Sequence, residues 1–360
     1  MALSRHALEA IRDHKYVAGT YTTLDRILLS YWWRPLSLYL PDFISPNALT
    51  LVGFGCSLAA FGVCACLCPM ATEDVHPAAC LLVATLLFAY QTADALDGLQ
   101  ARRLKLGTPL GQLLDHGCDA YSTQVFAFVG VAVAGRGDSD WFSLAIFTVM
   151  NLQLGVFNWW EQQFKTFPTC TGELGVTEGQ AVVIGLWVIK AICPWIFTAE
   201  LVPGLLLNTP IVTVIIGLLL FVLFSSVFKG FQELPASDVR RALCDIGLVI
   251  VHTVLVGVLW FGFRSASFWL RASLVIVLNG AYGYHSTLGN ISHQNRPPFD
   301  VGLAPVYILG TSAWVGIGHR MLFFAMMYNL LYSSRRVARD LDDVSQFLNT
   351  PLFAVRPKAQ

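Results

Sequence analysis

The chain has 360 residues, of which 55% are apolar and only 13% are charged. Soluble domains carry about 25% charged residues, so this composition excludes a disordered chain and is not typical of a soluble enzyme. Lys and Arg together number 23, as do Asp and Glu, and this balance argues against a nucleic-acid partner. We therefore expect an all-α, polytopic integral membrane protein.

The first 45 residues precede the first long apolar run. Their charged start lacks the apolar core of a cleavable signal peptide. The aromatic, partly amphipathic stretch from Leu28 to Leu40 has the composition of a segment that lies on a bilayer surface. Residues 1–45 are thus predicted to form a cytosolic or interfacial N-terminal segment.

The remaining apolar runs predict about ten transmembrane helices. A helix needs about 20 residues to cross the hydrocarbon core. The last stretch is too long for one crossing and is interrupted at Gly316–Arg320, so we read it as two. The runs are 48–69, 79–100, 110–134, 141–159, 178–198, 210–228, 242–263, 267–288 and 301–333.

Basic residues give the predicted orientation. With a cytosolic N-terminus, 18 of the 23 Lys and Arg residues fall on the cytosolic side. Cytosolic segments carry an excess of such residues. Both termini are therefore expected in the cytosol.

Four acids lie close together in two of the predicted spans, and acids within a membrane usually mark function. Asp94 and Asp97 are three residues apart and share a helix face, and Asp115 and Asp119 share another at a spacing of four. A left-handed cap at Gly107 would end the first helix. Thr108-Pro109 would start the second, so the short turn would bring the two acidic faces together.

Such a cluster needs cations, because four carboxylates cannot share a small space without neutralisation. Oxygen ligands favour Mg²⁺ or Mn²⁺, and four acids suit two ions. Gly98 and Gly111 leave room for a ligand, and Arg102 can bind a phosphate through its planar donors. Two-metal phosphoryl transfer is the favoured interpretation; the alternative is a buried acid network in a cation-coupled transporter.

At these positions the sequence resembles the CDP-alcohol phosphotransferase family, whose signature is D-x2-D-G-x2-A-R-x8-G-x3-D-x3-D. All of its fixed positions are filled, by Asp94, Asp97, Gly98, Ala101, Arg102, Gly111, Asp115 and Asp119. The surrounding YQTADALDGLQARR and DHGCD, with HKY at residues 14–16, SPNALTLVGF from residue 45 and VTEGQ at 176–180, are similar to the eukaryotic choline/ethanolamine phosphotransferase branch. Gln112 stands where that branch often has Glu.

The resemblance implies a membrane enzyme of the endoplasmic reticulum or Golgi, with its active site facing the cytosol. It would transfer phosphocholine or phosphoethanolamine from CDP-choline or CDP-ethanolamine to diacylglycerol or an alkyl-acylglycerol, releasing CMP. A homodimer is implied as well. We expect residues 46–200 to hold the catalytic helices, 201–334 further transmembrane helices and 335–360 a cytosolic tail.

The resemblance also implies roles for single residues. The four motif aspartates would hold two Mg²⁺ or Mn²⁺ ions, and Asp119 would be the general base. His116 is a rival base, but on a helix it points about 100° away from Asp115, so the alternative is a histidine that only supports the residues around the site. Gly98, Ala101 and Gly111 would accept the cytidine side of the donor, with plain helix packing as the alternative role, and Arg102 would bind its diphosphate.

Three further points stay open at the sequence level. Trp159, Trp160 and Tyr90 either form a cation–π cage for a quaternary ammonium group or, for the tryptophans, anchor a span end. Glu161 and Glu178 either line the path of the head group or are solvated. The alternative functions are a family relative with another acceptor, such as inositol, and the cation-coupled transporter.

Overall fold

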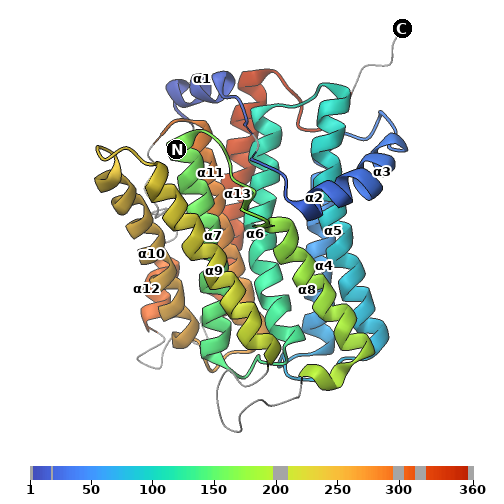
Figure 1. Ribbon diagram of the computed structural model, residues 1–360. Helices are drawn as coiled ribbons and strands as arrows, with labels where there is room; N and C mark the ends of the chain where they lie inside the picture. Colours follow the sequence, from blue (N-terminus) through green and yellow to red (C-terminus); the bar gives the residue numbers. More distant parts are fainter. Residues whose placement is uncertain (1–2, 18, 198–209, 295–303, 313–321, 356–360) are drawn as a thin grey trace.

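The computed structural model describes residues 3–17, 19–197, 210–294, 304–312 and 322–355. Long helices run side by side and form a bundle (Figure 1). They are α4 (Pro46–Leu67), α5 (Pro77–Leu104), α6 (Pro109–Val133), α7 (Asp140–Phe164), α8 (Val176–Ile192), α9 (Pro210–Glu233), α10 (Val239–Gly262), α11 (Phe268–Ile291) and α13 (Leu322–Leu348). The predicted all-α class is thus confirmed for the described residues. These also contain two short strands, β1 (Cys170–Thr171) and β2 (Leu174–Gly175), which pair as one hairpin.

Among the described residues, four helices are long and apolar enough to cross a membrane, namely α4, α5, α7 and α10. This finding supports an integral membrane protein. The count of about ten crossings and the side on which the termini lie stay predictions. The expected interruption at Gly316–Arg320 falls outside the described residues, between α12 (Ala304–Ser312) and α13.

Central to the bundle is α6, most of whose residues are buried. Its partner α11 approaches closely, because a Cβ at Gly283 would lie 2.6 Å from the Ala120 Cβ and one at Gly280 would meet the Tyr121 ring. Further along, the Phe128 ring stacks on Trp260 of α10 with centroids 5.6 Å apart. This packing fixes the helix that carries two of the motif aspartates.

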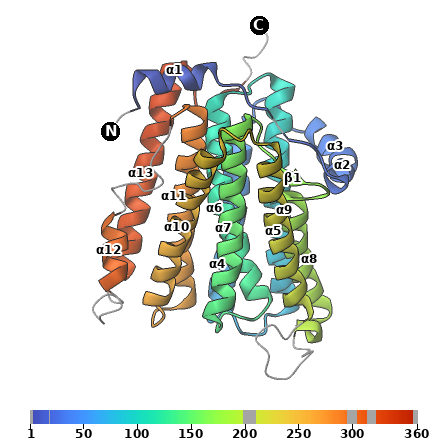
Figure 2. The same ribbon diagram turned by 60° about the vertical axis from the view of Figure 1, so that its left-hand side comes forward.

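One end of the bundle is covered by both ends of the described chain. Helix α1 (Arg5–Asp13) lies across this end next to α13 (Figures 1 and 2). The Leu3 backbone N–H donates to Asp343 Oδ2 at 3.2 Å, and Asn47 Nδ2 donates to the Leu352 carbonyl at 2.6 Å. We call this arrangement of α1, the end of α13 and Leu352 the terminal cap.

Beside the same end stands an arm of three short helices, α2 (Thr23–Leu28), the π-helical turn η1 (Leu29–Trp33) and α3 (Arg34–Leu38) (Figures 1 and 2). Tyr31 is 81% exposed on this arm. Trp32 fixes the arm to α5, since its Nε1 donates to Thr92 Oγ1 at 3.2 Å. The arm includes the stretch expected at the bilayer surface, and its contact with lipid stays a prediction.

At the opposite end of the bundle, Lys190 of α8 is buried beside the end of α6. Its Nζ donates to the Val133 carbonyl at 3.0 Å, and the short helix η2 (Pro194–Phe197) follows α8 and places the Phe197 ring 5.6 Å from the same atom. A cation is favourable at a helix C-terminus, where carbonyl groups lack helical partners. Lys190 therefore ties α8 to α6.

Candidate functional site

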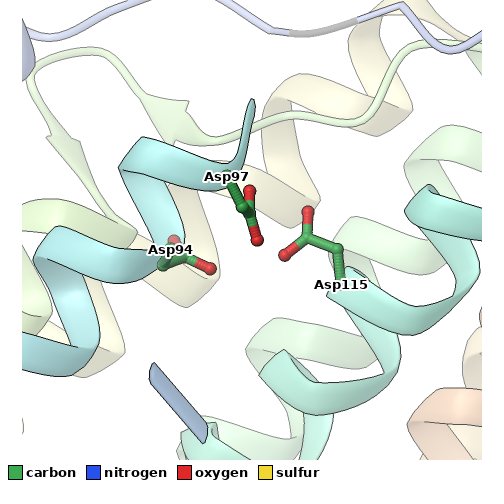
Figure 3. Close-up of side chains that lie close together, drawn as sticks. All are labelled: Asp94, Asp97 and Asp115. Atoms are coloured by element: carbon green, nitrogen blue, oxygen red, sulfur yellow. The ribbon is translucent and has the colours of Figure 1, made fainter. Parts of the chain in front are cut away.

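Three of the four motif aspartates meet where α5 and α6 pass each other (Figure 3). Asp94, Asp97 and Asp115 each offer one carboxylate oxygen, and these oxygens lie within 4.8 Å of one another. Asp119 lies one turn beyond Asp115 on α6, and its carboxylate interacts electrostatically with that of Asp94. The two predicted acidic faces therefore do face each other.

The turn between these helices differs in part from the expectation. Helix α5 ends at Leu104, and Lys105 rather than Gly107 takes the left-handed conformation, with φ +56°. The Leu106 N–H then closes the turn on the Ala101 carbonyl at 2.9 Å, so the prediction of a cap at Gly107 was wrong. Thr108 does cap α6, because its Oγ1 accepts from the Gly111 N–H at 3.1 Å.

Two hydroxyl groups orient the aspartates from the side of the bundle interior. Thr50 of α4 donates its Oγ1 hydrogen to Asp97 Oδ2, and Tyr90 of α5 donates its Oη hydrogen to Asp119 Oδ1 at 2.8 Å. Sequence reasoning missed both roles. Both residues lie in segments that carry the family resemblance, which was the available signal.

The donor set fits a divalent cation. Asp115 Oδ1 is buried and has no hydrogen-bond partner in the described part of the chain. A buried polar atom without a partner is unfavourable, and a cation ligated by the three carboxylates would satisfy it. Carboxylate oxygens are the ligands that Mg²⁺ and Mn²⁺ prefer.

Two neighbouring arginines at the end of α5 have different surroundings. The Arg102 guanidinium folds back over Gly98, where a Cβ would lie 3.3 Å from its Nη1, and it has no carboxylate partner among the described residues. Arg103 instead pairs with Asp42 at 3.0 Å and donates to the Leu40 carbonyl at 2.6 Å. Arg102 is the arginine that remains available to a ligand.

Small residues keep the space beside the aspartates open. A Cβ at Gly111 would lie 3.3 Å from Asn47 Oδ1. Ala101 is partly exposed on α5, one turn from Asp97. These positions fit the expected binding of a flat or extended ligand, and their roles stay predictions.

His116 lies on a different side of α6 from the aspartate group. Its ring contacts Tyr16 edge-on with centroids 5.5 Å apart and Phe167 with centroids 4.5 Å apart. His116 Nδ1 is buried and has no hydrogen-bond partner within the described ranges. The His116 ring thus lies among aromatic rings next to the aspartate group. From this position it does not ligate a metal ion held by the aspartates.

Glu161 forms a buried network that sequence reasoning did not find. It is 4% exposed, so the interpretation as a solvated residue was wrong. Glu161 Oε1 accepts from Gln112 Nε2 at 3.0 Å, and Oε2 accepts from Asn290 Nδ2 at 2.9 Å. Gln112 Oε1 in turn pairs with His14 Nε2 at 3.0 Å, so this network links the N-terminal segment, α6, α7 and α11.

Of the two interpretations of Trp159, Trp160 and Tyr90, the aromatic cage does not fit their packing. Trp159 and Trp160 are buried against α9, where a Cβ at Gly230 would lie 2.6 Å from the Trp159 ring. The Trp160 ring already has Lys229 Nζ 5.7 Å from its centroid. Tyr90 is buried and bound to Asp119, so these rings are not available to a head group.

An open, apolar pocket begins one turn beyond Asp119. Its empty volume is about 1340 Å³ including the mouth. Thr123 of α6 lies at the near end, and Glu178 of α8 is a polar residue of the wall. Helices α6, α7, α8 and α9 supply the apolar lining, which includes Phe126, Ile146, Val149, Val183, Leu186 and Leu219.

Comparison with known proteins adds independent information. The sequence profile described as CDP-alcohol phosphatidyltransferase matches residues 43–277. Cholinephosphotransferase 1 of Homo sapiens is 31% identical over 270 residues, which are 71% of this chain and 64% of that protein. Cholinephosphotransferase 1 of Xenopus laevis is 30% identical over 332 residues, 84% of this chain and 78% of the relative.

A third relative, from Dictyostelium discoideum, is described as uncharacterized CDP-alcohol phosphatidyltransferase class-I family protein 2 and is 34% identical over 191 residues. Those residues are 53% of this chain and 46% of the relative. The chain spans less than two thirds of the human relative's length. The matched residues 43–277 include every motif position and both helices of the aspartate group.

Proposed function

Because this chain belongs to the CDP-alcohol phosphatidyltransferase family, we propose that it transfers a phosphoalcohol from a CDP-alcohol to a lipid. The donor is CDP-choline or CDP-ethanolamine, the acceptor is diacylglycerol or an alkyl-acylglycerol, and CMP is released. Relatives named cholinephosphotransferase 1 support phosphocholine as the transferred group. The observation that carries the proposal is the aspartate group, in which Asp115 Oδ1 has no hydrogen-bond partner among the residues that the structure describes.

The donor binds at the end of α5 and the start of α6. Asp94, Asp97 and Asp115 would hold one Mg²⁺ or Mn²⁺ ion, and Asp119 would help to hold a second. Bound divalent ions supply positive charge that offsets the carboxylates and the diphosphate. Arg102 binds the diphosphate, as supported by the position of its guanidinium over Gly98 without a carboxylate partner in the described part of the chain.

The cytidine side of the donor lies along the small residues Gly98, Ala101 and Gly111. A side chain at Gly111 would crowd Asn47 of α4, and one at Gly98 would crowd the Arg102 guanidinium, so bulky residues there would narrow the donor site. The phosphorus that carries the alcohol then faces Asp119. Holding the acceptor hydroxyl and the phosphorus next to each other supplies part of the rate enhancement.

Asp119 acts as the general base. The acceptor oxygen forms a bond to the β-phosphorus, the bond from that phosphorus to the CMP oxygen breaks, and the hydroxyl proton passes to Asp119. Tyr90 donates to Oδ1 and so orients the carboxylate that would take this proton. His116 is the second candidate for the base, favoured by its buried Nδ1 without a partner among the described residues.

The apolar pocket takes the acyl chains of the acceptor. Its near end at Thr123 lies four residues beyond Asp119 on the same face of α6. An acceptor whose chains fill the pocket places its hydroxyl group beside Asp119. A water-soluble alcohol such as inositol would leave this apolar surface unused.

The membrane arrangement extends this proposal. We propose about ten transmembrane helices with both termini and the active site on the cytosolic side, in the endoplasmic reticulum or Golgi, and a homodimer. The terminal cap supports the placement of both chain ends on the side of the aspartate group. Residues 1–45 are the cytosolic or interfacial segment, 46–200 hold the catalytic helices, 201–334 add transmembrane helices and 335–360 form the tail.

One assay tests the proposed function. Purified protein with Mg²⁺, diacylglycerol and labelled CDP-choline or CDP-ethanolamine is expected to yield labelled phospholipid and CMP. Absence of product with both donors, in Mg²⁺ and in Mn²⁺, would reject the proposal. Product with inositol as the acceptor, or cation flux into liposomes without CMP release, would instead support the two alternative functions.

A further inference from the structure

Tyr16 is an exposed aromatic side chain beside the aspartate group that the proposed reaction does not yet use. It is 45% exposed. The Tyr16 ring meets the His116 ring edge-on, with centroids 5.5 Å apart. Phe167, on the loop between α7 and α8, places its ring centroid 4.5 Å from that of His116. Two rings from distant segments therefore gather around one histidine at the catalytic end of the bundle.

The segment that carries Tyr16 is held in place on both sides. His14 binds Gln112 of α6 at 3.0 Å, and the Val17 carbonyl accepts from the Phe167 N–H at 3.2 Å. Gly19 lies so close to the loop that a Cβ there would be 2.9 Å from the Phe167 carbonyl oxygen. Tyr16 is thus fixed relative to Phe167 rather than placed on a loose end.

The surroundings of Tyr16 favour a cation. Its phenol interacts electrostatically with the carboxylates of Asp115, Glu161, Asp119 and Asp94. A tyrosine is a neutral phenol near pH 7, and its ring face is electron-rich. A cation near such a face is attracted by the ring, and Glu161 is a nearby carboxylate that the proposed ions do not use.

We propose that Tyr16 and Phe167 form the aromatic wall of the head-group subsite and bind the trimethylammonium group of the donor. This inference rests on the proposed function. A trimethylammonium group has no N–H to donate, so ring faces and nearby negative charge are what it requires. The same wall selects for a charged head group over an uncharged one of equal shape.

A matched pair of donors isolates this interaction. CDP-choline is compared with the CDP ester of 3,3-dimethylbutanol, whose tert-butyl group has the shape of choline without its charge. The ratio of kcat/KM for the two donors is measured for the unaltered protein and its variants. In Tyr16→Leu we expect this ratio to fall roughly fivefold to thirtyfold, the range of a partly to well desolvated cation–π contact.

Conservative and distant variants make the result specific. Tyr16→Phe keeps the ring and is expected to stay within about twofold of the unaltered ratio. Phe167→Leu should lower the ratio in the same direction as Tyr16→Leu. Tyr31→Leu, which changes an 81% exposed tyrosine on the arm, is the matched control and should leave the ratio unchanged.

The outcomes separate this inference from the proposed function. Activity of the unaltered protein with CDP-choline decides the function, whereas the donor ratio decides the subsite. An unchanged ratio in both Tyr16→Leu and Phe167→Leu would overturn the inference while the function stands. If a variant does not turn over, equilibrium binding of the two donors to the monodisperse protein replaces kcat/KM, with the same loss of preference expected.

Discussion

The aspartate group and Glu161 are both acidic sites at the same end of the bundle, but their oxygens are satisfied in different ways. Amide groups from Gln112 and Asn290 bind one oxygen each of Glu161. In the aspartate group the carboxylates face one another, and Asp115 Oδ1 has no partner in the described ranges. The oxygens of Glu161 thus have partners without a ligand, whereas the aspartate group still has an oxygen that a ligand could satisfy.

This difference separates two uses of a buried acid. Neutral amides satisfy Glu161 locally, so its role is to join α6, α7 and α11. Close carboxylates repel one another unless a cation lies between them, so the aspartate group stores unfavourable interactions that ligand binding relieves. Substitutions at the two sites should therefore affect different measurable quantities.

The largest effect is expected from Asp97→Asn. The amide keeps the shape and can still accept from Thr50, but it removes a charged ligand from the group. Loss of several kcal/mol of charge stabilisation corresponds to at least about a 1000-fold fall in kcat. The measurement is phospholipid formation at saturating donor, with thermal unfolding as the control for folding. Unaltered activity would mean that the group is structural, like Glu161.

A smaller effect is expected from Arg102→Gln, measured against Arg103→Gln. Arg102 is free to bind a phosphate, and its loss should lower kcat/KM for the CDP donor about tenfold to a hundredfold. Arg103 binds Asp42 and the Leu40 carbonyl, so its loss should affect mainly stability, by at most about 1 kcal/mol. Equal losses of kcat/KM in the two variants would contradict the distinction between these arginines.

The smallest effect on chemistry is expected from Glu161→Gln. The new amide keeps one acceptor and loses the other, which should lower the free energy of unfolding by about 1–3 kcal/mol. The concentration of Mg²⁺ that gives half-maximal activity should stay the same, because Glu161 is satisfied by amides. A tenfold rise in that Mg²⁺ concentration would show that Glu161 belongs to the metal site. It would contradict the distinction drawn between Glu161 and the aspartate group.

Sequence spacing was sufficient to predict the two acidic faces and the start of α6. Intervals of three and four residues determine which side chains share a helix face, and Thr108-Pro109 is a local capping signal. The cap after α5 was predicted at Gly107 but lies at Lys105. The reason is that glycine favours the left-handed conformation without being required for it, and the bond from Leu106 to Ala101 closes the turn earlier.

Contacts between distant segments could not be predicted from spacing. Thr50 reaches Asp97 from another helix, and Gln112 reaches Glu161 in the same way. For the same reason spacing could not decide between a cage and another role for Trp159, which packs against Gly230 of α9. The sequence shows which residues carry chemistry, whereas helix packing decides which of them is left with a free face.

The terminal cap has a consequence for biosynthesis. Leu3 binds Asp343 and Asn47 binds Leu352, so the start of α4 next to Gly111 is completed by residues that leave the ribosome about 300 residues later. Contacts of such separation in sequence form late. The end of the bundle that holds the aspartate group would therefore stay unfinished while the middle helices are being made.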